Sequence, residues 1–127
     1  MNLFGIGIDV VEVARLESSL LEFGDRFKDK IFTVSEIEYC DKQKRPAIHF
    51  AARFAAKEAI AKAFGTGIGK NIGWLDIEIA RKESGEPEVL LFGAGRQFAD
   101  DQKISKIKIS LTHAQHYAAA NAVVLAE

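Results

Sequence analysis

The stretch FAAKEAIAKAFGTGIG, residues 54–69, is a run of small and apolar helix formers that ends in a glycine-rich loop. Ala51, Ala55, Glu58 and Lys62 follow the i, i+4, i+7, i+11 spacing of one helical stripe. A carboxylate and an ammonium group therefore project from a surface that can pack closely. Such a pair serves either as a surface contact, worth about 0.2–0.5 kcal/mol, or as part of a site for a divalent metal ion and a phosphate. The spacing alone favours the surface contact.

Residues 3–11 at the start of the chain alternate as a strand does. One face would carry Phe4, Ile6, Ile8 and Val10, and the other Gly5, Gly7 and Asp9. Glycine inside a strand often marks the close approach of a ligand or of another backbone. The pattern predicts that Asp9 lies on a face cleared of side chains, and a simple solvent-facing acid is the alternative.

The rest of the chain divides into helices followed mostly by strands. We expect a helix over 13–23, a loosely helical or turn segment over 27–32, a short helix opened by the Thr33–Glu36 capping box, and a long helix over 46–64 capped by Gly65. Strands are expected over 75–79, 89–92, 107–111 and 117–125, with a short helix over 94–102. This order predicts an α+β fold, a largely antiparallel sheet packed against one long and several shorter helices. At this length we expect one domain, residues 1–127.

Composition and charge narrow the function classes. The chain has 48% hydrophobic and 28% charged residues, no apolar run that suits a membrane span, and no signal peptide pattern. A single cysteine, Cys40, fits a reducing compartment, so we expect a cytoplasmic protein. The net charge of −1 argues against nucleic-acid binding.

The charges are unevenly distributed along the chain. Residues 42–70 hold seven basic side chains and one acidic side chain, whereas residues 1–41 hold nine acidic and four basic ones. A basic middle third predicts a local anionic ligand or an acidic partner. We expect some of these basic residues, Lys57 among them, to lie on a solvated helix flank.

Three groups of residues are candidates for chemistry. Asp9 and Glu58 are hard oxygen donors of the type that Mg²⁺ binds. The loop at residues 65–70 follows a helix instead of preceding one, so it is not a nucleotide-binding P-loop; part of it caps the helix, and its remaining amides can contact an anion. His113 suits a general base or a cationic phosphate contact, with a structural hydrogen-bonding role as the alternative.

Three motifs together carry a family resemblance: GIGIDVVEVAR at residues 5–15, RFAAKEAIAK at 53–62 with FGTGIG at 64–69, and SLTHA at 110–114. They resemble the holo-acyl-carrier-protein synthase family, the small bacterial 4′-phosphopantetheinyl transferases. The resemblance implies transfer of 4′-phosphopantetheine from coenzyme A to a serine hydroxyl of apo-acyl carrier protein, with release of adenosine 3′,5′-bisphosphate, in support of fatty acid biosynthesis. It also implies the family's α+β fold and a homotrimer with active sites at subunit interfaces.

The resemblance also implies roles for single residues. Asp9 and Glu58 would hold Mg²⁺, and Lys62 would contact phosphate and act with Glu58 in catalysis. His113 would lie near the 3′-phosphate of coenzyme A. Further coenzyme neighbours would be Arg53, Gly65, Thr66 and Gly67, and the acidic carrier helix would meet Arg15 and Arg26.

Two positions depart from the family's pattern. Ala114 stands where some relatives carry an acid considered for proton transfer, and Glu86 replaces the usual base of a glycine–basic–proline turn. The proton acceptor for the serine hydroxyl stays open among Glu58, a metal-bound water and a carboxylate of the carrier. Two rival functions also stay open: another Mg²⁺-dependent enzyme acting on a nucleotide pyrophosphate, and a non-catalytic module that binds coenzyme A or a carrier protein.

Overall fold

The computed structural model describes all residues, 1–127. In chain order the elements are β1 (Asn2–Glu12), α1 (Val13–Phe23), α2 (Asp25–Ile31), α3 (Val34–Asp41), α4 (Pro46–Phe64), the 3₁₀ turn η1 (Trp74–Asp76), β2 (Ile77–Arg81), β3 (Pro87–Leu91), α5 (Gly93–Asp101), β4 (Ile104–His113) and β5 (Tyr117–Ala126). Every helix and strand expected from the sequence is present, and the segment expected as loosely helical or a turn forms α2. None of the helices combines the length and apolar character that a membrane span needs.

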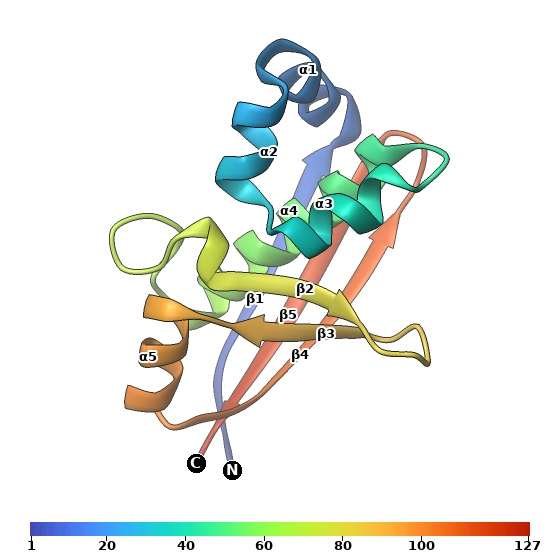
Figure 1. Cartoon of the computed structure of the whole chain (residues 1–127). Coiled ribbons are helices and arrows are strands. Elements are labelled where there is room, and N and C mark those ends of the chain that lie inside the picture. The colour runs from blue at the N-terminus through green and yellow to red at the C-terminus, as the bar shows by residue number, and fades with distance from the viewer.

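The strands form two antiparallel sheets. One has the order β1-β5-β4, and the other is the β2-β3 hairpin. Helix α4 lies between them, the hairpin crosses in front of the long strands, and α1 to α3 gather at one end (Figure 1). The predicted α+β class is confirmed, with the antiparallel pairing divided between two sheets.

The ends of the helices follow from local chemistry. Pro46 occupies the first turn of α4, and Gly65 ends that helix in the left-handed conformation at φ 80°. At the start of α3 the Thr33 hydroxyl accepts from the Glu36 amide, while the Glu36 carboxylate accepts from the Thr33 amide. The cap positions predicted from the sequence are therefore confirmed.

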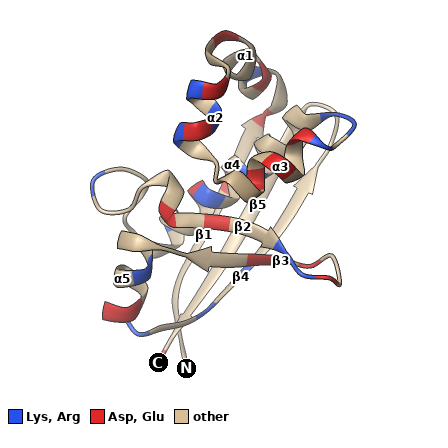
Figure 2. Cartoon of the chain, in the orientation of Figure 1, with Lys and Arg blue, Asp and Glu red and all other residues tan.

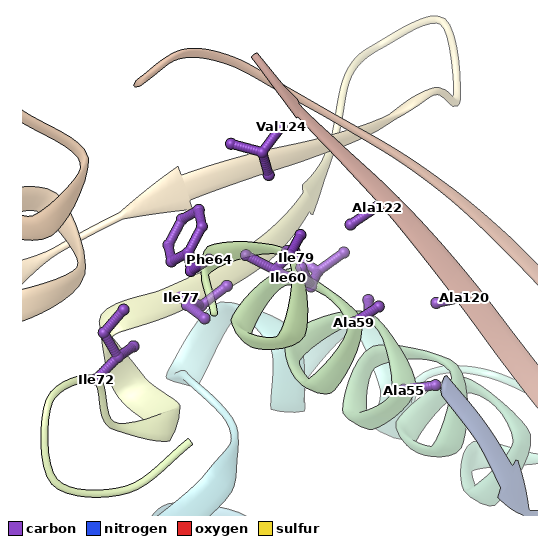
Figure 3. Close-up of a cluster of buried hydrophobic side chains, with 12 residues drawn as sticks. Ala55, Ala59, Ile60, Phe64, Ile72, Ile77, Ile79, Ala120, Ala122 and Val124 are labelled. Carbon is purple, nitrogen blue, oxygen red and sulfur yellow. The ribbon is translucent and has the colours of Figure 1, made fainter. Parts of the chain in front are cut away.

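The main hydrophobic core lies around α4. Alanines on one side of the helix meet Ala120 and Ala122 of β5, and Ile60 and Phe64 lie among isoleucines of the hairpin side (Figure 3). The small side chains let the helix pack closely on the sheet, and the larger ones fill the space toward β2 and β3. This packing fixes the long helix that carries Glu58, Lys62 and Arg53.

The glycine face of β1 serves this packing. A Cβ atom added at Gly5 or Gly7 would lie 1.9 Å from a carbonyl oxygen of α4, that of Ala63 or Ala59. The close approach suggested by the two glycines is therefore made by the chain's own helix. The opposite face of β1 points outward, with Ile6 69% and Ile8 65% exposed.

Lys57 is the one basic residue of the middle third whose expected place is wrong. Its side chain and that of Glu36 are both 0% exposed, and its Nζ lies 2.7 Å from Glu36 Oε1. The same Nζ donates to the carbonyl oxygens of Ile31 and Trp74. Lys57 faces inward because α2, α3 and η1 cover that side of α4, which helical spacing alone does not reveal.

Candidate active site

Asp9 and Glu58 line one groove of about 520 Å³ between β1, α1 and α4, which we call the acidic groove. Asp9 follows Gly5 and Gly7 on the face of β1 that meets α4, and its side chain is 18% exposed. Lys62 Nζ donates to Asp9 Oδ1 at 3.0 Å and to the Ile8 carbonyl at 3.0 Å. Tertiary packing thus brings together the two carboxylates and the lysine that the sequence singled out.

The electrostatics of this groove favour a cation between the carboxylates. Burial raises the pKa of Glu58, the neighbouring Asp9 carboxylate raises it further, and Lys62 opposes them. No group of three or more His, Cys, Asp or Glu side chains is placed so that it could hold a metal ion. Two carboxylates match the donors that Mg²⁺ takes from proteins when phosphate oxygens and waters complete its shell, so the donor set fits that ion.

A second pocket, of about 280 Å³, is rich in cationic groups. Its charged and titratable lining residues are His49, Arg53, Arg81 and His113, with no carboxylate among them. Arg53 is 4% exposed, and its Nε has no hydrogen-bond partner. The structure thus places Arg53 and His113 in one pocket, and we call the four residues His49, Arg53, Arg81 and His113 the cationic pocket.

His49 and Arg81 are the members of the cationic pocket that sequence reasoning missed. The His49 and His113 rings lie edge to face with centroids 5.4 Å apart. Burial lowers the pKa of His49, and His113, Arg53 and Arg81 lower it further. The spacing of His49 one helical turn before Arg53 was a usable signal for this residue. Arg81 had no such signal.

The acidic groove and the cationic pocket lie on opposite flanks of α4. Glu58 and His49 are nine positions apart in the helix, about two and a half turns, so they project from opposite sides. Glu58 lines only the first cavity, and His49 only the second. A ligand that contacts both groups within one chain would have to cross the helix.

The first three backbone amides of the glycine loop after α4 donate hydrogen bonds to carbonyl oxygens at the end of that helix. Gly65 N donates to the Lys62 carbonyl, and Thr66 N and Gly67 N donate to that of Ala61. The Thr66 hydroxyl donates to the Gly67 carbonyl. These groups cap the helix, so an anion nest would have to use other amides of the loop.

Arg15 and Arg26 sit on the helices beside the acidic groove. Arg15 on α1 lines the groove together with Phe27 and Phe54, while Arg26 on α2 is exposed outside it. Charged residues lie on α1 to α3 and also on the β2–β3 hairpin and α5, with fewer on the long strands (Figure 2). Arg15 is therefore the member of this pair that reaches the carboxylates' groove.

Similarity to known proteins identifies the family of this chain. Residues 5–122 match the model of the 4′-phosphopantetheinyl transferase superfamily. The chain belongs to this superfamily. It is therefore a 4′-phosphopantetheinyl transferase, as the sequence motifs predicted.

Individual relatives cover nearly the whole chain. A holo-[acyl-carrier-protein] synthase of Ruminiclostridium cellulolyticum is 45% identical over 94% of this chain and 90% of its own length. The Helicobacter pylori synthase in complex with coenzyme A is 33% identical, with a TM-score of 0.85 over 94% of this chain and 99% of that one. The Bacillus anthracis synthase, in complex with CoA (3′,5′-ADP), is 33% identical with a TM-score of 0.82 over the full length of both chains.

Proposed function

We propose that this enzyme transfers 4′-phosphopantetheine from coenzyme A to a serine hydroxyl of an apo-acyl carrier protein and releases adenosine 3′,5′-bisphosphate. The observation that carries the proposal is the pairing of an acidic groove with a separate cationic pocket. Coenzyme A has two separate anionic parts, a pyrophosphate and a 3′-phosphate. The first suits a cation held by Asp9 and Glu58, and the second suits Arg53 and His113. The complexes of the two bacterial relatives support the same ligand.

Asp9 and Glu58 would hold Mg²⁺ in this reaction. The ion would neutralise charge on the pyrophosphate and polarise the attacked phosphorus. Lys62, half exposed beside Asp9, is free to turn from that carboxylate to a phosphate oxygen. There its ammonium group stabilises the negative charge that builds up on the departing bisphosphate.

We also propose a homotrimer with active sites at the subunit interfaces. The outward face of β1 exposes Ile6, Ile8 and Val10, each at least 60%, which is an apolar strip suited to burial against another copy. Because the acidic groove and the cationic pocket lie on opposite flanks of α4, one coenzyme molecule reaches both only if they come from two subunits. An assembly that brings the groove of one copy to the pocket of the next completes the site.

The acyl carrier would dock beside the acidic groove. Arg15 and Arg26 present positive charge on α1 and α2, the elements next to Asp9 and Glu58. Complementary charge of this kind contributes mainly to the association rate and to specificity, and it weakens as salt rises. We place the enzyme in the cytoplasm, because its single cysteine is free and buried, which suits a reducing compartment.

Mass spectrometry tests the transfer directly. Apo-carrier protein incubated with coenzyme A, Mg²⁺ and the enzyme should gain the mass of one phosphopantetheine. The gain should disappear with a chelator and with Glu58→Gln, and it should persist with Arg96→Gln, an exposed residue of α5. An unmodified carrier under saturating conditions would refute the proposed activity.

Mixed assemblies test the shared site. Glu58→Gln and His113→Ala each damage one part of the site, so each variant alone should be impaired. Co-expressed, they should regain part of the activity, because some interfaces then join an intact groove to an intact pocket. If mixing restores nothing, the two parts act within one chain and the interface proposal is wrong.

A further inference from the structure

Tyr39 of α3 contacts three members of the cationic pocket. The Arg53 Cζ lies 4.2 Å from the centroid of the Tyr39 ring, and the Arg81 Cζ lies 5.4 Å from it. Arg81 Nη1 also donates a hydrogen bond to the Tyr39 hydroxyl. One phenol ring therefore holds two guanidinium groups that come from α4 and β2.

The same ring contacts a third member of the cationic pocket. His49 lies edge to face with Tyr39 at a centroid distance of 6.0 Å. Four side chains that carry or can carry positive charge thus line a pocket without a carboxylate. Guanidinium groups that repel one another in this way need a fixed partner, and the negative face of an aromatic ring supplies one.

Two observations indicate that the pocket takes an anion with several oxygens. The side chain of Arg53 is buried, since the residue is only 4% exposed, yet its Nε–H has no hydrogen-bond acceptor. Gly85 of the β2–β3 turn and Pro87 at the start of β3 line the pocket, while Glu86 between them pairs with Lys108 at 3.1 Å. The positive charge on this side of the pocket therefore comes from Arg81. Gly85 leaves room for that side chain, since a Cβ atom at this position would lie 3.3 Å from Arg81 Nη2.

We propose that Tyr39 is a positioning residue that holds Arg53 and Arg81 as a two-guanidinium clamp on the 3′-phosphate of coenzyme A. The proposal rests on the proposed function and adds Arg81 as a binding residue. Guanidinium groups bind phosphate through paired N–H donors. The ring fixes the planes of both groups before the ligand arrives, so less conformational freedom is lost on binding.

Calorimetric titration with coenzyme A and with dephospho-coenzyme A, which lacks the 3′-phosphate, tests this clamp. The wild-type enzyme should prefer coenzyme A. Arg81→Gln and Tyr39→Leu should each lower that preference by about tenfold or more and leave the affinity for dephospho-coenzyme A unchanged. Tyr39→Phe keeps the ring and should retain most of the preference, and Arg96→Gln on α5 is the matched arginine control.

The outcomes separate the clamp from the function it depends on. A wild-type preference that survives Tyr39→Leu and Arg81→Gln overturns the clamp alone. Equal loss of both ligands in Tyr39→Leu also overturns it, because that result shows a general structural role. A wild-type enzyme that binds neither ligand overturns both the clamp and the proposed function.

Discussion

Replacing Lys57 with methionine tests how far the buried ion pair supports this fold. Lys57→Met keeps the length of the side chain but removes an ammonium group with three acceptors, at 2.7 Å to Glu36, 2.8 Å to Ile31 O and 3.0 Å to Trp74 O. Both partners of the pair are 0% exposed, so no water replaces the lost contacts. Burial lowers the pKa of Lys57, and the Glu36 carboxylate opposes that shift.

The expected loss is large for a single substitution. Removing one partner of a buried ion pair typically destabilises by about 3–5 kcal/mol, because an uncompensated charge remains. Glu36 would keep only the donors Thr33 N and Ile79 N. For a chain of this size such a loss corresponds to a fall in Tm of roughly 10–20 °C.

Urea denaturation followed by far-UV circular dichroism, at one protein concentration for all variants, measures the effect. Lys82→Met is the control, since Lys82 is 47% exposed and lies 3.8 Å from Glu86; it should change stability by less than about 0.5 kcal/mol. The double variant Lys57→Met/Glu36→Gln should be less destabilised than the sum of its single variants by about 2 kcal/mol. A Lys57→Met protein within about 1 kcal/mol of the control would refute this account of the pair.

Four other predictions follow from the packing and the electrostatics. Gly7→Ala should destabilise the protein by about 3 kcal/mol or more in urea denaturation, because the new Cβ would lie 1.9 Å from a carbonyl oxygen of α4. The control Gly73→Ala should be nearly neutral, because the atom nearest to its new Cβ would lie 3.7 Å away. Glu58→Gln should lower the transfer rate by about 10²-fold or more, and Mg²⁺ should raise the Tm of the wild type but not of this variant. The pKa of His49 is lowered below 6.5 in the folded protein, so the folded state resists protonation of this ring and stability is lost as the pH falls below about 6.5. His49→Gln should reduce that loss in the unliganded protein. Equal slopes of unfolding free energy against pH for wild type and variant would contradict the assignment. Ile8→Lys should reduce the mass measured by light scattering from that of a trimer to that of a monomer, and an unchanged mass would exclude this face as the interface.

The sequence by itself determined the elements and their ends. The capping box at Thr33, the proline at the first turn of α4 and the glycine at its end are local signals, because they act through hydrogen bonds and backbone angles within a few residues. The residue pattern singled out Asp9 and Glu58, and the motifs were long enough to identify the family and to imply their roles. Alternation and helical spacing are also local patterns, so they predicted the α+β class from the sequence.

Only the tertiary structure decided which neighbours each face meets. The glycines of β1 could admit a ligand or another backbone, and the fold shows that backbone to be α4. Lys57 has the same local sequence context as a solvent-facing lysine, and three separate elements bury it. Arg81 joins the cationic pocket from β2, and Tyr39 of α3 contacts it, although these residues lie far from Arg53 in the chain. Contacts of this kind depend on how distant segments pack, and no periodicity within one segment encodes them.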